Sequence, residues 1–571
     1  MRLFCFSLLL IFTFGCSKSK TNRSNLLNFV PKNTTIIIKT SNLESLNSSI
    51  DNSDFLQRIS KSTTYKNLEK KLEPLSNLNP SNDVLIYFSQ DENDSLQYAL
   101  ATKITKNLFV TDSLPNYKEE VLSYKNNSII KSTINNSTFY SAIIDSTFFV
   151  SSSKTIMDDA FYSFNDDVEL EKIYNTSGND KTFSMILKPK TNFVSSFFVE
   201  DSLSLNIFAE YVAIDVELNQ NDTYFNGITK ATDSTESLIN IFKNTTPQVN
   251  QIQNITPSNS DGFMSFTFDD FEILKTNLLK FNKKDSFVNS TTLFDDVVEV
   301  GVIYEDEKRA VVLNSTDVIA TNDALLSEQT IANSYREINI YNFSQPVLFA
   351  KTFMPLISDN NANVYCVLDN FFVFADQTEM LQNIIANYQN KTTLGNKLYF
   401  KDVKEKLSDA SSLLQVTNAS TLKAILNKNI DANTNFKLNN YNTSAIQFIS
   451  DNNFAHINGV IKKNKTRASL NSVSEELNIK LDKALLNSPQ FVKNHITKQK
   501  EIVVQDVNNN LYLISNKGKI LWKKQLQGPV LGKIKQIDIY KNGRLQLAFA
   551  TPNKVYVLDR NGKDVKPFTL N

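Results

Sequence analysis

The sequence predicts an α+β protein made of two tandem homologous domains, each an antiparallel sheet with helices, and a small all-β unit at the C-terminus. Three observations support this prediction. Similar segments recur about 230 residues apart, short polar turns separate neighbouring apolar strands, and residues 501–571 contain a shorter repeat. The predicted boundaries are 28–250 and 251–496 for the two domains and 497–571 for the C-terminal unit. A length of 571 residues with 41% hydrophobic side chains suits several folded domains.

The N-terminus, residues 1–15, has the features of an export signal. Arg2 supplies a positive charge, and the apolar run that follows is too short to cross a bilayer as a helix. Gly15 precedes Cys16, and this junction resembles a bacterial lipobox. The resemblance implies that the signal is removed, that Cys16 is diacylated, and that residues 16–27 form a tether. An ordinary signal peptide with a chance cysteine is the alternative.

The long repeat consists of three matched blocks in the same order. The offsets between their members are 228, 224 and 232 residues. The blocks are 36–46 with 264–274, 142–150 with 366–374, and 213–216 with 445–448. Such a period is far longer than the 20–50 residues of a solenoid unit, so it predicts two homologous domains rather than an array.

Each half of the repeat has the order strand–helix, hairpin, hairpin–helix, strand–helix, long hairpin. Asp145-Ser146 and Asp369-Asn370 are turn residues between apolar runs, and strands joined by such short turns are antiparallel. This order predicts helices on one face of an antiparallel sheet. A Pro-x-x-Thr start at residues 29–34 and a turn leading into Phe-Val-Ser at 144–151 resemble a group of bacterial envelope proteins of unknown function. The resemblance covers about two thirds of the chain and implies no activity.

The C-terminal unit has its own period, because residues 511–519 recur as 555–563 at an offset of 44. The pattern, apolar-Tyr-apolar-apolar followed by Gly-Lys and Trp522, resembles the quinoprotein-like β-propeller repeat. A closed propeller needs at least four blades of about 40–45 residues each, and this segment is too short for one. We therefore expect a small sheet docked on residues 251–496 with Trp522 buried, and no quinone. Completion of a partner's sheet is the alternative.

No residue pattern in the chain predicts catalysis, a metal site or a cofactor. Cys366 lies in an apolar strand, which predicts a buried and unreactive thiol. The two histidines, His456 and His495, have no nucleophile elbow near them and are too few for a zinc cluster. Adjacent carboxylates point to opposite faces of a strand, so pairs such as Asp269-Asp270 suit caps and turns.

Three pairs of neighbouring phenylalanines have two interpretations. Because adjacent residues face opposite sides of a strand, they predict central strands buried on both faces. An apolar ligand groove is the alternative. The pairs are Phe148-Phe149, Phe197-Phe198 and Phe371-Phe372.

Charge and the export signal together suggest a function. Residues 501–571 hold twelve Lys/Arg and five Asp/Glu, a net +7 against −7 for the rest of the chain. This basic unit suits docking on the acidic body, or contact with an envelope protein, an anionic polymer or lipid head groups, and nucleic acid is not expected. We predict a lipid-anchored, non-enzymatic scaffold or binding protein, on the periplasmic face of the outer membrane. An envelope glycan hydrolase that uses dispersed carboxylates is the alternative.

Overall fold

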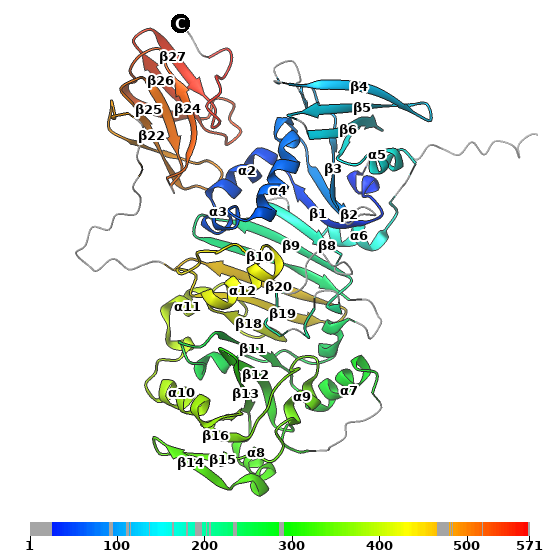
Figure 1. Cartoon of the computed structure of the whole chain (residues 1–571), viewed down its shortest axis with the longest axis vertical. Coiled ribbons are helices and arrows are strands. Elements are labelled where there is room, and N and C mark those ends of the chain that lie inside the picture. The colour runs from blue at the N-terminus through cyan, green and yellow to red at the C-terminus, as the bar shows by residue number, and fades with distance from the viewer. Residues whose placement is uncertain are drawn as a thin grey trace, which may run out of the picture. The chain divides into compact units, whose positions relative to one another are not determined.

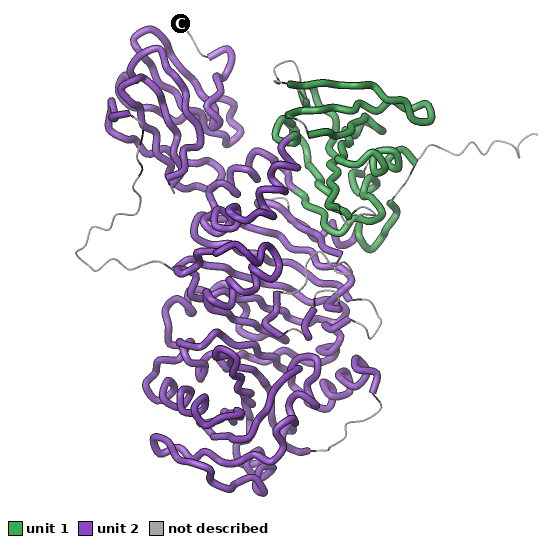
Figure 2. Tube along the Cα trace, viewed as in Figure 1, with its two compact units in different colours: residues 1–39, 74–171 green, residues 40–73, 172–571 purple. Residues whose placement is uncertain are grey.

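The structure, a computed structural model, places the described part of the chain in two compact units (Figure 2). One unit comprises residues 1–39 with 74–171, and the other comprises 40–73 with 172–571. The described residues are 25–568, apart from 91–94, 110–113, 115, 136, 163–164, 179–180, 189–196, 201, 205–206, 232–236, 285–290, 465–478, 480, 482 and 517. The export signal and Cys16 lie outside them. Among the described helices, none is long and apolar enough to cross a membrane.

The first unit is a seven-stranded antiparallel sheet in the order β1–β2–β3–β7–β6–β5–β4 (Figure 1). Helix α5 follows β7 and packs against β6 and β7. The strands are β1 (Thr34–Thr40), β2 (Val84–Gln90), β3 (Leu96–Lys103), β4 (Lys118–Tyr124), β5 (Asn127–Ile134), β6 (Ser137–Ile144) and β7 (Thr147–Ser151). The helices are α5 (Lys154–Ala160) and α6 (Val168–Tyr174), with short 3-10 turns η1 (Leu26–Phe29) and η2 (Glu73–Asn77).

The second unit contains a thirteen-stranded antiparallel sheet. Its order is β8–β9–β10–β20–β19–β18–β11–β12–β13–β17–β16–β15–β14. The strands are β8 (Phe183–Leu187), β9 (Tyr211–Leu218), β10 (Asp222–Lys230), β11 (Gly262–Thr267), β12 (Val297–Glu305), β13 (Lys308–Ser315), β14 (Ile331–Tyr335), β15 (Ile338–Asn342), β16 (Val364–Leu368), β17 (Phe371–Ala375), β18 (Leu413–Thr417), β19 (Thr443–Asp451) and β20 (Phe454–Lys462). From β11 onward the strand order repeats that of the first unit, with every strand number raised by ten.

Two helices of the second unit, α2 and α7, follow a strand and begin at a polar cap. Asn42 caps α2 by accepting a hydrogen bond from the backbone N–H of Ser45, and Asp270 caps α7 in the same way. The cap at Asp270 confirms the role predicted for the pair Asp269-Asp270. The helices are α2 (Leu43–Asn52), α3 (Asp54–Ile59), α4 (Thr63–Leu72), α7 (Phe271–Phe281), α8 (Val318–Ala324), α9 (Leu348–Phe353), α10 (Thr378–Gln389), α11 (Leu398–Lys404) and α12 (Ala419–Asn429). Four 3-10 turns complete the set: η4 (Leu238–Phe242), η5 (Ile252–Asn254), η6 (Leu326–Glu328) and η7 (Leu394–Asn396).

The central strands of this sheet are buried on both faces. In β17, Phe372 belongs to the hydrophobic cluster on one face, and Phe371 belongs to the cluster on the other. The two-sided interpretation of this phenylalanine pair is therefore confirmed. Phe197 and Phe198 lie outside any strand, so the strand prediction for that pair is wrong.

The prediction of two tandem α+β domains is wrong. Strands make up 38% and helices 24% of the structure, and β10, which precedes residue 250, pairs along its length with β20. The last hairpins of the two sequence repeats thus share one sheet. An unpaired strand edge exposes a row of backbone N–H and C=O groups, and pairing between the hairpins satisfies them. Sequence periodicity predicts strands and turns, but it contains no signal for which edges will meet.

The ladder between β10 and β20 has a symmetric register. Asn226 lies opposite Asn458, and these two asparagines correspond at the 232-residue offset of the sequence repeat. The six neighbouring strands are β8, β9, β10, β20, β19 and β18. Counted outward from the β10–β20 ladder, each strand of one repeat has its counterpart of the other repeat at the same position. Gly227 and Gly459 flank this point, and a Cβ atom on Gly227 would lie 2.0 Å from the carbonyl oxygen of Ala213.

The C-terminal segment forms two small antiparallel sheets with a shared core. The strands are β21 (Gln490–Lys493), β22 (Lys500–Gln505), β23 (Asn510–Ile514) and β24 (Ile520–Gln525) in one sheet, and β25 (Leu531–Ile537), β26 (Gln546–Thr551) and β27 (Lys554–Leu558) in the other. Side chains from both sheets form one cluster, which includes Leu513 and Phe549. These seven strands do not close a propeller ring.

Trp522 is only partly buried, so the prediction of a buried indole is wrong in degree. Its Nε1–H donates to the backbone oxygen of Arg560 at 2.7 Å, and its ring covers Gly562. Hydrogen bonds from this segment reach helix α2: Arg560 to Ser48 at 2.5 Å and Lys519 to Asp51 at 3.0 Å. Helix α2 lies outside the residues 251–496 on which the sequence predicts docking.

Candidate functional site

The cysteine and the two histidines of residues 25–571 lie far apart in the structure. Cys366 is buried in β16, and burial raises the pKa of its thiol to about 12, which keeps it protonated. His456 is exposed on β20, whereas His495 lies in the C-terminal segment, where burial and nearby arginines lower its pKa to about 4. Among the described residues, no group of three or more His, Cys, Asp and Glu side chains could hold a metal ion.

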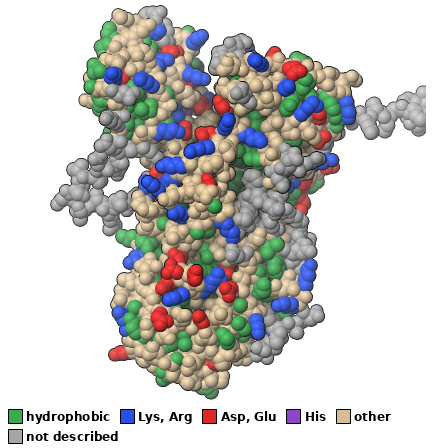
Figure 3. Space-filling model, in the orientation of Figure 1, with side chains coloured by type: hydrophobic (Ala, Val, Ile, Leu, Met, Phe, Trp, Pro, Cys, Tyr) green, Lys and Arg blue, Asp and Glu red, His purple; other side chains and the backbone are tan. Residues whose placement is uncertain are grey.

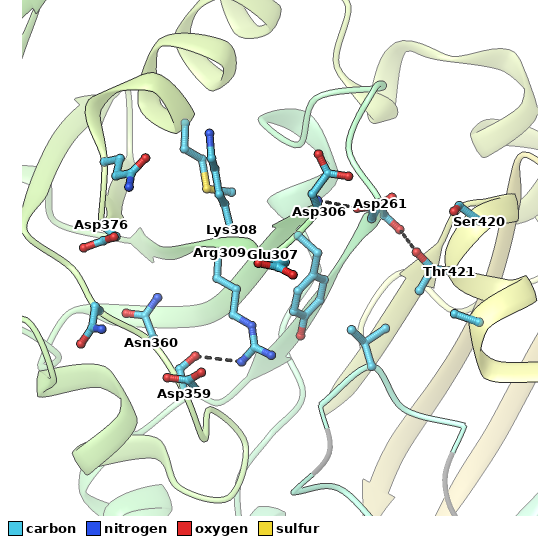
Figure 4. A pocket seen from close by; sticks show the side chains of 16 residues that line it. Asp261, Asp306, Glu307, Lys308, Arg309, Asp359, Asn360, Asp376, Ser420 and Thr421 are labelled. Atoms are coloured by element: carbon cyan, nitrogen blue, oxygen red, sulfur yellow. Dashed lines mark hydrogen bonds between the residues drawn. The ribbon is translucent and has the colours of Figure 1, made fainter. Parts of the chain in front are cut away.

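A cavity of about 1150 Å³ lies in the second unit, and we call it the polar cavity (Figure 4). Its walls come from the start of β11, the β12–β13 turn, the loop before β16, the junction of β17 with α10, and the first turns of α12. The lining residues are Val199, Asp261, Tyr304, Asp306, Glu307, Lys308, Arg309, Asp359, Asn360, Asn361, Asp376, Gln377, Met380, Ser420, Thr421 and Ala424.

Asp261 joins three of these walls. Its carboxylate accepts hydrogen bonds from the backbone N–H of Asp306 at 2.7 Å and from Nδ2 of Asn418, the cap of α12, at 3.0 Å. Its backbone oxygen accepts a bond from Thr421 Oγ1 at 3.1 Å. Asp306 has a φ of 52°, a left-handed conformation that asparagine and aspartate tolerate in tight turns. Asp261 therefore fixes the β12–β13 turn against α12.

A buried carboxylate, Glu200, holds the opposite wall. It is fully buried and accepts hydrogen bonds from the Tyr304 hydroxyl and Ser358 Oγ, both at 3.0 Å. Arg309 Nη1 lies 3.3 Å from the same carboxylate and also donates to the backbone oxygen of Asp359 at 2.8 Å. Burial and the adjacent carboxylate raise the pKa of Tyr304 well above its ordinary value. This network fixes the loop that leads to Asn360.

Asn360 has no hydrogen-bond partner for its amide. Its side chain is 5% exposed, and neither Oδ1 nor Nδ2 finds a partner among the described residues. Buried polar groups in proteins are nearly always paired, and one left unpaired costs about 1–3 kcal/mol. Figure 4 shows Asn360 beside Asp359 on the wall of the polar cavity, where Arg309 reaches in from β13. A ligand in the cavity could supply the missing partners.

The cavity walls are rich in carboxylates. Figure 3 shows acidic side chains gathered on this face of the second unit, near α10 and α12. The described lining holds five carboxylates and two cationic groups, and Arg309 already faces Glu200. The five are Asp261, Asp306, Glu307, Asp359 and Asp376. All five are at least partly exposed, which differs from the buried carboxyl group that glycosidases use as a general acid.

The sequence did not predict this site. Its carboxylates come from four separate segments between residues 261 and 376, and strand pairing brings them together. The pair Asp306-Glu307 reads as an ordinary hairpin turn, and Asp376 reads as a polar residue before a helix. One feature of the sequence could have indicated the site: Asp306-Glu307 and Asp376 each follow the end of an apolar strand.

A smaller cavity of about 380 Å³ lies at the corresponding place in the first unit, and we call it the first-unit pocket. Ser89 and Gln90 at the end of β2 and Ser153 after β7 line it. Lys32 and Asp159 are the charged residues among its described lining. Asp159 is thus the one carboxylate among the described lining residues of this pocket.

Comparison with known proteins does not identify a family for this chain. No protein family matches the sequence, and no curated protein matches it. The solved structure entitled "Structure of crystal form III of TP0453" is similar over 39% of this chain and 89% of that one, at 10% identity and a TM-score of 0.23. A similarity this weak carries no argument about fold or function.

Proposed function

We propose that the protein is a membrane-anchored envelope lipoprotein that acts as a non-enzymatic binding protein, with the polar cavity as its binding site. The anchoring part of the proposal rests on Gly15 and Cys16 in the sequence. The binding part rests on one observation, the buried and unpartnered amide of Asn360. The location that we propose is the outer membrane, facing the periplasm.

The lining favours holding a ligand over transforming it. No histidine or cysteine occurs among the described lining residues, so Ser420 and Thr421 have no general base of that kind in the cavity. Tyr304 and Arg309 are engaged with Glu200 and hold the wall in place. No described lining residue favours the glycan hydrolase alternative, so we do not propose that function.

We also propose that the C-terminal sheets are a blade-like unit that contacts an envelope protein or an anionic polymer. The support is the sequence period of 44 residues, the four-stranded sheet β21–β24 and the net charge of +7. A surface of one charge sign attracts partners of the other sign.

Metabolic labelling with an alkyne fatty acid tests the anchor. We expect label on the wild-type protein and none on the Cys16→Ser variant. Label that persists in the variant would contradict acylation at this position.

Native mass spectrometry of the full chain, after incubation with the small-molecule fraction of an envelope extract, tests binding. We expect an adduct on the wild type that is reduced at least tenfold on Asn360→Leu, because leucine has similar volume and no amide. Glu405→Gln, a change on the exposed end of α11, is the matched control and should retain the adduct. Equal adducts on all three proteins, or none on the wild type, would overturn the proposal, and a ligand recovered in cleaved form would favour a hydrolase.

A further inference from the structure

We infer that the polar cavity binds an oligosaccharide with free amino groups. The inference rests on the proposed binding function and specifies its ligand. Two independent features carry it: the unpartnered amide of Asn360 and the exposed carboxylates around the cavity.

The amide of Asn360 needs a ligand that both donates and accepts hydrogen bonds. Its Oδ1 accepts and its Nδ2 donates, and both atoms lack a partner among the described residues. An ammonium group only donates and a carboxylate only accepts, whereas a hydroxyl group does both. Neighbouring hydroxyl groups on a sugar ring can therefore satisfy both atoms of the amide. This favours a polyhydroxylated ligand.

The described lining holds five carboxylates against two cations, Lys308 and Arg309, and this excess favours positive charge on the same ligand. Asp306, Glu307 and Asp359 are exposed at the cavity, and Arg309 is already bound to Glu200 and to the loop. A single inorganic cation does not suit these groups, since no set of three or more described metal-binding side chains converges. Ammonium groups spaced along an extended ligand can reach separate carboxylates and form charge-assisted hydrogen bonds.

The size and polarity of the cavity agree with an oligomer. Small-molecule sites are usually about 300–1,000 Å³ and mostly apolar. The polar cavity, at about 1150 Å³, is larger than this range, and most of its lining side chains are polar or charged. A hydrophilic chain of several rings fits this cavity better than an apolar molecule or a single sugar.

Isothermal titration of the full chain at about 0.15 M salt tests the inference with three probes. The glucosamine tetramer has hydroxyl and free amino groups, the N-acetylglucosamine tetramer has hydroxyl groups without the charge, and spermidine has amino groups without hydroxyl groups. We expect the glucosamine tetramer to bind at least tenfold tighter than either of the others. Screening at this salt concentration weakens exposed charge pairs but does not abolish them.

Two variants separate the contributions. Asp306→Asn combined with Glu307→Gln should weaken binding of the glucosamine tetramer about tenfold and leave the acetylated tetramer unchanged. Asn360→Leu should weaken both sugars, and Glu405→Gln should weaken neither. Thermal melting of each variant confirms that it is folded.

Each other outcome overturns the inference in a distinct way. Spermidine binding as tightly as the glucosamine tetramer would indicate a plain cation site, and equal binding of the acetylated tetramer would indicate a neutral glycan. If no probe binds while the envelope extract still gives an Asn360-dependent adduct, the proposed function stands and the amino sugar is wrong. If the adduct is also absent, both fail.

Discussion

The two regions that share one strand order differ in the pockets at the ends of their strands. Strands β1 to β7 pair in the same order as β11 to β17, and a helix follows β7 and β17 alike. The first-unit pocket measures about 380 Å³, and Lys32 and Asp159 are the charged residues of its described lining, whereas the polar cavity measures about 1150 Å³ and its described lining holds five carboxylates. The same strand order thus surrounds two pockets of different size, and the loops at the strand ends supply much of the lining of each.

The two regions also differ inside their second strands. Strand β12 contains Glu299, which is fully buried, whereas β2 contains no carboxylate. Glu299 Oε2 accepts a hydrogen bond from the backbone N–H of Gln251 at 2.7 Å, and Oε1 has no hydrogen-bond partner in the described structure. Among the described residues of the first region, no Asp or Glu is buried in this way.

The largest expected effect separates the two equivalent glycines. A Cβ atom at Gly227 would meet the backbone of Ala213 at 2.0 Å, and backbone cannot move aside. At Gly459 the nearest atom is the end of the Phe225 ring, which can rotate away. We expect Gly227→Ala to cost about 3 kcal/mol or more and Gly459→Ala about 1 kcal/mol, measured by urea denaturation. An equal loss of stability in the two variants would contradict the expected difference between Gly227 and Gly459.

The next effect is a pH dependence specific to the second region. Burial raises the pKa of Glu299 to about 7 from 4.5. Because the folded-state pKa is the higher one, the stabilising effect of the protonated carboxyl is complete below about pH 4.5 and is lost as pH rises through 7. The loss amounts to roughly 3 kcal/mol.

The Glu299→Gln variant tests this dependence. We expect the stability difference between pH 5 and pH 8, measured by urea denaturation, to be smaller in the variant than in the wild type by about that amount. Glu405→Gln is the control and should behave as the wild type. A variant with an unchanged pH profile would place the titration on another group.

The smallest effect concerns the caps of two corresponding helices. Ser153 caps α5 by accepting a hydrogen bond from the backbone N–H of Ile156, whereas Gln377 makes no side-chain cap for α10. We expect Ser153→Gln to lose about 1 kcal/mol and Gln377→Ser to gain a similar amount. Thermal melting measures both changes. If neither change alters the melting temperature, the loops rather than the caps set the stability of these helix starts.

Local features of the fold follow from the sequence, and long-range pairing does not. The turns predicted at Asp145 and Asp369 are present, and both residues have left-handed φ values, 48° and 53°. The two-sided burial of Phe371 and Phe372 also follows from the alternation of a strand. These features depend on a few neighbouring residues, which sequence patterns describe well.

The joined sheet and the polar cavity depend on residues far apart in the chain. The β10–β20 ladder links segments 232 residues apart, and no local pattern distinguishes an edge that stays free from one that pairs. The partnerless amide of Asn360 is a property of packing, because asparagine in a loop is common in any sequence. Sequence reasoning could therefore find the cap at Asp270 but not the cavity.

The ladder between β10 and β20 also makes completion of the sheet depend on residues far along the chain. β10 ends at residue 230 and β20 begins at residue 454. A chain cut between these strands leaves one edge of β10 without the strand that covers it in the full-length protein, and free edges recruit strands from other chains. Truncated chains are therefore at greater risk of misassembly than the full-length chain.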